Sequence, residues 1–62
     1  MNIYIITVNG KVSQEGYQSL ADAQRFCSTR TDRPYKLTDY LYISYLNLYK
    51  IIPVTIKEAN NE

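Results

Sequence analysis

The stretch from Ile3 to Lys11, IYIITVNGK, decides the fold of this 62-residue chain. Its first six residues are β-branched or aromatic, which is typical of a β-strand. Asn9 and Gly10 then supply the two positions of positive φ that a two-residue hairpin turn requires. The expected register pairs Val8 with Lys11, Thr7 with Val12, Ile6 with Ser13 and Ile5 with Gln14.

The two strands of this predicted hairpin differ in character. The first is apolar on both faces, whereas the second, which Gly16 is expected to end, is mostly polar. A strand that is apolar on both faces is suited to the middle of a sheet, and a polar one to its edge. We therefore expect the first strand to be central and the second to lie at an edge.

A helix is predicted after the hairpin. Ser19 and Asp22 match the capping pattern in which the serine oxygen accepts a backbone N–H and the acid reaches back to the cap. The pattern gives a helix of about eleven or twelve residues that ends before Pro34, with Arg30 in its last turn. Its inner face is expected to carry Leu20, Ala23 and Cys27, with Phe26 beside them.

The second half of the chain admits two interpretations. Residues 40–46, YLYISYL, have the aromatic and β-branched content of a strand, yet the apolar positions from Leu37 to Leu48 also fit a helical stripe. We favour the strand over the helix. Residues 48–57 then form a final strand, in which Pro53 faces away from the ladder at an edge or bulge. The inward set of this strand is expected to be Ile52, Val54 and Ile56.

These elements predict an α+β fold of order ββαββ, with one helix packed on a small antiparallel sheet. Residues 1–58 form the single domain, and residues 59–62 form a polar C-terminal tail. A chain this short buries only about 60% of the surface that its unfolded form exposes, so its core is marginal. The lone cysteine cannot form a disulfide within the chain, and self-association is therefore the expected source of extra stability.

The composition argues against catalysis. The chain has no histidine, so the commonest general base is missing, and Cys27 is expected to be an inert core thiol. Asp22, Asp32 and Asp39 have no spacing typical of a metal loop. We expect no catalytic residue, no metal and no cofactor.

The charge and hydropathy patterns suggest where the chain works. Seven Lys or Arg residues against six Asp or Glu give a net charge of +1, which favours neither a polyanion partner nor an acidic decoy. No apolar stretch approaches the length of a membrane span, and Met1 leads into the first strand without a basic signal segment. With the single cysteine, this predicts a cytoplasmic protein.

Tyrosine is the most informative residue type for function. The chain has seven tyrosines, and a single helix cannot cover both faces of the sheet, so apolar surface is left over. We expect this surface to bind a partner protein or a second copy as a homodimer. The predicted contact residues are the clustered Tyr40, Tyr42, Tyr45 and Tyr49.

A basic segment gives an alternative. Four of the seven cations lie within twelve residues and could grip phosphates while nearby tyrosines stack on bases, which would make the chain a small nucleic-acid-binding regulator. The same residue types also suit contact with a protein. These candidate anion or partner contacts are Arg25, Arg30, Arg33 and Lys36.

Three segments carry a resemblance to known proteins: residues 4–8 in the opening strand, 19–26 in the helix and 49–54 in the closing strand. Together they resemble a loose group of small accessory proteins encoded by phages and prophages of low-GC Gram-positive bacteria. The resemblance implies a non-enzymatic protein that binds a host protein and inhibits or redirects it, antiphage defence components included. It assigns no site residues, because members of this group share architecture more than a site.

Overall fold

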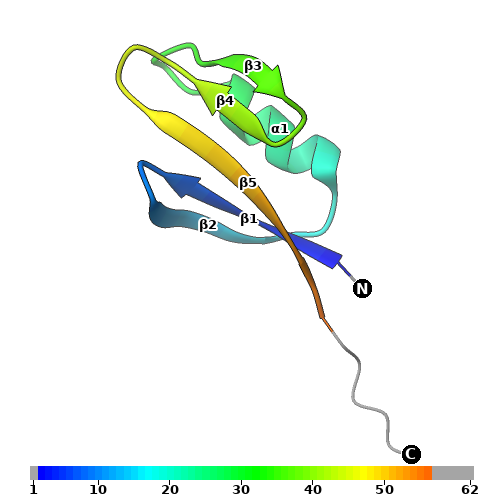
Figure 1. The fold of residues 1–62 in the computed structure, drawn as a ribbon. Coiled ribbons are helices and arrows are strands. Elements are labelled where there is room, and N and C mark those ends of the chain that lie inside the picture. The colour runs from blue at the N-terminus through cyan, green and yellow to red at the C-terminus, as the bar shows by residue number, and fades with distance from the viewer. Residues whose placement is uncertain (1, 57–62) are drawn as a thin grey trace, which may run out of the picture.

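The computed structural model describes residues 2–56, which form a five-stranded antiparallel sheet with one helix across one face (Figure 1). The predicted α+β class, with a single helix on a small antiparallel sheet, is confirmed. The predicted tail of residues 59–62 and the end of the predicted domain at residue 58 lie outside the described part of the chain.

The hairpin joins β1 (Asn2–Val8) to β2 (Lys11–Tyr17). Asn9 and Gly10 both have positive φ, 53° and 86°, as the predicted turn requires. The pairs of Val8 with Lys11 and of Thr7 with Val12 are as expected.

Beyond those two pairs the predicted register is wrong. Ile6 pairs with Gln14 instead of Ser13, and Tyr4 pairs with Tyr17, because bulges add residues to β2. Gly16 lies within β2 at a φ of 89°, a conformation that glycine adopts at little cost, so it does not end the hairpin.

The helix α1 (Leu20–Ser28) begins where the sequence predicts, since the Ser19 side chain accepts from the backbone N–H of Asp22 at 3.3 Å. It has nine residues, fewer than expected. The Thr29 hydroxyl donates to the carbonyl of Arg25 at 2.8 Å and so satisfies a carbonyl of the last turn. Arg30 therefore lies beyond the helix and not in its last turn.

Three strands follow the helix: β3 (Tyr35–Thr38), β4 (Leu41–Ile43) and β5 (Leu48–Thr55). The choice of strand over helix in this region is confirmed. The strand predicted over residues 40–46 is shorter, because the chain bends after Ile43, and β3 adds a fifth strand that the sequence analysis did not separate.

The strands lie in the order β2-β1-β5-β4-β3. As predicted, β1 lies in the interior of the sheet with a neighbour on each side, and β2 is an edge. β5 has two neighbours only along its first half, because its pairing with β4 stops at Lys50. The N–H of Ile51 donates to the carbonyl of Tyr40 at 2.8 Å, on the β4 side. The nitrogen of Pro53, two residues later, faces the same side, where no strand in residues 2–56 pairs with it, as the sequence predicted.

The core lies between α1 and the sheet, and its buried apolar residues are Ile6, Ala23, Cys27, Tyr42, Tyr49 and Ile51. The predicted position of Cys27 is confirmed, and burial raises the pKa of its thiol to about 11. The inward set predicted for the last strand is wrong. Ile51 is buried opposite Ile6, so Ile52 and Val54 face the other side of the sheet, and Ile56 lies after the strand ends.

Candidate interaction face

The structure divides the predicted tyrosine cluster. Tyr42 and Tyr49 pair across β4 and β5 under α1 and are only 5% and 3% exposed. Burial raises the pKa of both phenols, and for Tyr49 its hydrogen bond to a carboxylate adds to the effect. These two tyrosines are core residues, so they do not offer their rings to a partner.

Tyr40 and Tyr45 are exposed, at 43% and 87%. They lie in the turns on either side of β4, and the three residues of that strand and Ser44 separate them. They do not form one continuous aromatic surface with Tyr42 and Tyr49. Of the four predicted contact residues, these two have rings available to a partner.

The predicted basic patch is also divided. Arg25 forms an ion pair with Asp22 at 3.0 Å, and Lys36 forms one with Asp39 at the same distance. The ion pair with Asp39 raises the pKa of Lys36.

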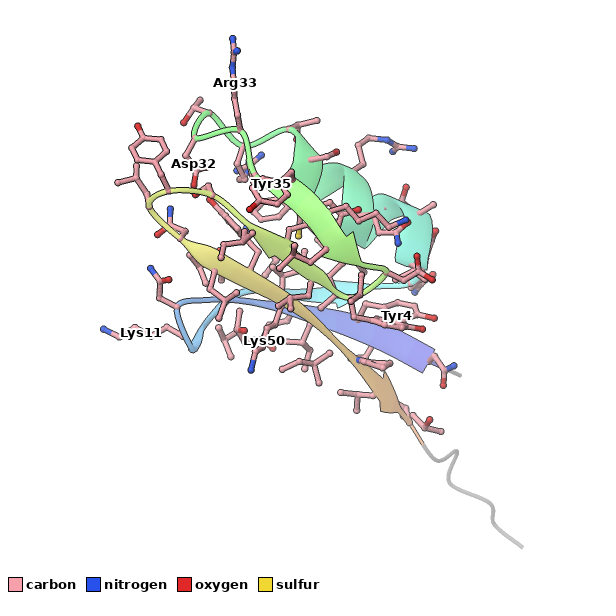
Figure 2. All side chains as sticks on the ribbon, turned by 45° about the horizontal axis from the view of Figure 1, so that its top comes forward. Tyr4, Lys11, Asp32, Arg33, Tyr35 and Lys50 are labelled. Atoms are coloured by element: carbon pink, nitrogen blue, oxygen red, sulfur yellow. The ribbon has the colours of Figure 1, made fainter. Side chains whose placement is uncertain are left out.

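The remaining two cations differ in setting. The guanidinium of Arg30 lies 3.8 Å from the centre of the Phe26 ring, and its Nε donates to the Phe26 carbonyl at 2.9 Å. Arg33 is exposed and extends away from the body of the molecule (Figure 2). Two of the four cations are therefore paired with carboxylates, a third lies against Phe26, and Arg33 is exposed.

A polar cluster centred on Asp32 fastens the loop after α1 to the loop between β4 and β5. The Asp32 carboxylate accepts from the Ser44 hydroxyl, from Asn47 Nδ2 at 3.0 Å and from the Tyr49 hydroxyl at 2.7 Å. These donors hold its pKa down, from 3.8 to about 2, with the Ser44 hydroxyl contributing most. A carboxylate so stabilised in its charged form is a poor general base near neutral pH.

The cluster continues to the first hairpin. Asn9 Nδ2 donates to Asn47 Oδ1 at 2.7 Å, and the backbone N–H of Leu48 donates to Asn9 Oδ1 at 2.9 Å. A hollow of about 280 Å³ borders the cluster, lined by residues 29–32, Leu46, Asn47 and Tyr49. The polar side chains here bind one another, so we interpret the cluster as a structural link between three loops.

The sequence did not predict which residues form the face of the sheet opposite α1. Residues paired directly across strands point to the same side, and Ile6, Tyr42 and Ile51 define the side under α1. The opposite side, which we call the open face, consists of Ile3, Ile5, Thr7, Val12, Tyr35, Thr38, Leu41, Ile43, Leu48, Lys50, Ile52 and Val54.

Within residues 2–56, no helix or strand packs on the open face. Tyr35 is 62% exposed, Val12 58% and Ile52 41%. The alternation along β5 separates Ile52 and Val54 from their neighbours, but the prediction that these two residues face the core was wrong. What fixes the side is the pairing of Ile51 with Ile6, which depends on strand order.

Comparisons with protein-family models, curated proteins and solved structures found no match. No helix in residues 2–56 has the length and apolar character needed to cross a membrane. In the same part of the chain, no three Cys, Asp or Glu side chains come together in a way that could hold a metal ion.

Proposed function

We propose that this protein is a non-enzymatic protein-binding module and that the open face is its contact surface. One observation carries the proposal: α1 closes one side of the sheet, while on the other side Val12, Tyr35 and Ile52 are exposed and the remaining apolar side chains are half-buried, with no second layer over them within residues 2–56. Extended apolar surface on a small protein is typical of an interaction site. Tyr35 at the edge of this face adds an aromatic ring of the kind enriched at binding hot spots.

The partner we propose is a protein of a bacterial host cell, and the setting is the cytoplasm. This part rests on the architectural resemblance of residues 4–8, 19–26 and 49–54 to phage and prophage accessory proteins. Such a module would act by covering a functional surface of the host protein and so inhibiting or redirecting it, with antiphage defence components among the targets.

The test is capture from a Gram-positive bacterial lysate with matched variants. Ile52→Gln replaces an exposed apolar side chain of the open face, and Leu46→Gln replaces one in the loop after β4. We expect the wild type and Leu46→Gln to retain the same protein and Ile52→Gln to lose most of it. Circular dichroism would confirm that both variants are folded.

Two results would contradict the proposal. Equal capture by both variants would move the contact off the open face. Bound material that disappears after nuclease treatment, and affinity that falls steeply with salt, would favour the nucleic-acid alternative through Arg25, Arg30, Arg33 and Lys36.

A further inference from the structure

Lys50 occupies the middle of the open face. It lies on β5, the central strand, with Thr7 beside it on β1 and Leu41 beside it on β4. Leu48 and Ile52 precede and follow it on the same side of β5. Figure 2 shows its side chain pointing away from the sheet on the side opposite α1.

This lysine is exposed, and it forms no ion pair within residues 2–56. The other residues that direct strand pairing places on the open face are uncharged, and Glu15 is exposed in the bulged part of β2 opposite Ile5, two strands away from Lys50. Docking of another surface onto this apolar face would remove water from the cation at its centre, and desolvating that charge costs free energy. The cost is offset only when the covering surface brings an opposite charge to the same point.

A second copy of the chain does not satisfy this requirement well. Two open faces stacked about a two-fold axis through their centres would bring Lys50 against its own symmetry mate. Shifting the copies to separate the lysines would reduce the apolar area covered. The like charges of Lys50 and its symmetry mate would therefore oppose stacking of two copies through their open faces.

The edges of the sheet also limit how a partner could bind. β2 is interrupted by two bulges. The second half of β5 has no neighbour on the β4 side, but it contains Pro53, which has no N–H to offer there. These features oppose addition of a partner strand along β2 or the end of β5. The other edge strand, β3, has four residues and an irregular pairing with β4, so it offers little length to an added strand. Contact through the face is therefore the favoured mode.

We propose that the open face docks onto an apolar surface of another protein that carries an Asp or Glu carboxylate opposite Lys50. This inference rests on the proposed function and specifies the chemistry of its partner. The apolar residues around Lys50 supply contact area, and the lysine selects a partner with a central acid while keeping copies of the chain apart.

The first test measures self-association. Lys50→Met keeps an unbranched side chain one atom shorter and removes its charge. Lys11→Met does the same on β2, where Lys11 faces the α1 side opposite Val8. Sedimentation velocity should show monomers for the wild type and Lys11→Met, and concentration-dependent dimers or larger species for Lys50→Met. A wild-type dimer that Lys50→Met leaves unchanged would overturn the inference.

The second test locates the acid on the partner. A carbodiimide joins an amine directly to a carboxylate with no spacer, so treatment of the captured complex should link Lys50 to an Asp or Glu in an apolar part of the partner. Lys50→Arg keeps the charge but lacks the amine, so it should capture the partner without this link. Lys50→Glu should reduce capture at least about tenfold.

The outcomes separate this inference from the proposed function. A partner linked only through other lysines, and retained by Lys50→Glu, would overturn the inference and leave a protein-binding module. A link from Lys50 to an acid of a second copy would replace the partner with a homodimer. Failure of every variant and of the wild type to capture or link a protein would overturn both proposals.

Discussion

At the scale of single residues, Asp32 has the most clearly defined role. Its carboxylate accepts hydrogen bonds from three side chains of the loop after β4 and the start of β5, in a chain too small to hold its loops by core packing alone. The stabilisation depends on the charged form, because all three groups donate to it. Protonation of Asp32 therefore weakens the link between the loops.

This gives a prediction for the pH dependence of stability. The folded-state pKa of Asp32 is about 2, below its unfolded value of 3.8, so the unfolded chain binds the proton more tightly. The stabilisation is complete above pH about 4 and is lost as the pH falls from about 4 to about 2. Urea unfolding followed by circular dichroism should show Asp32→Asn less stable than wild type at pH 7.

The difference between Asp32→Asn and wild type should shrink between pH about 4 and about 2, since the variant has no carboxylate to protonate there. The comparison cancels the other acidic groups, which both proteins share. A difference that stays constant across this range would show that Asp32 acts through shape and not through its charge.

At the scale of elements, the ends of α1 matter more than its length. A nine-residue helix is too short to be stable alone, so its terminal hydrogen bonds and the packing of Ala23 and Cys27 maintain it. The Ser19 side chain caps the first turn, and the Thr29 hydroxyl donates a hydrogen bond to a carbonyl of the last turn.

Ser19→Ala is predicted to lower the free energy of unfolding by about 1 kcal/mol, because it removes the acceptor for the N–H of Asp22. In a domain of this size the melting temperature should fall by about 4–8 °C. Ser28→Ala is the matched control. Its hydroxyl only donates to the Arg25 carbonyl within the helix, and alanine favours helix, so thermal melting should be nearly unchanged or slightly higher. Equal losses in both variants would contradict the capping role.

At the scale of the whole molecule, the sheet has one closed and one open side. The closed side holds the only core within residues 2–56, and that core is small. The open side carries apolar residues that contribute to no second layer within residues 2–56. The closed side therefore stabilises the fold, and the contact surface that we propose lies on the opposite side of the same strands.

This division predicts different effects for two tyrosines of the original cluster. Tyr42→Ala should cost about 3–5 kcal/mol, because it empties a large site in the core, and in a marginal domain this should leave the chain largely unfolded. Tyr45→Ala removes an exposed ring and should change the free energy of unfolding by less than about 0.5 kcal/mol. Urea denaturation measures both, and similar losses would contradict the burial of Tyr42.

The sequence by itself determined the local structure of this protein. Asn9-Gly10 determines the hairpin turn because few residues adopt positive φ, and Ser19 determines the helix start because its oxygen satisfies a nearby N–H. Pro53 lies where β5 pairs with β1 but has no neighbour on the β4 side, because it has no N–H to donate to a strand there. Each of these depends on neighbours within a few residues.

Only the tertiary structure decided which side of each strand is buried. Alternation along a strand gives two sides but does not label them, so a shift of one residue exchanges the core set of β5 with the open face. The label comes from pairing Ile51 with Ile6 across forty-five residues, from the bulges in β2, and from the position of α1. For the same reason Tyr42 and Tyr49 belong to the core, while Lys50, the residue after Tyr49 on β5, belongs to the open face.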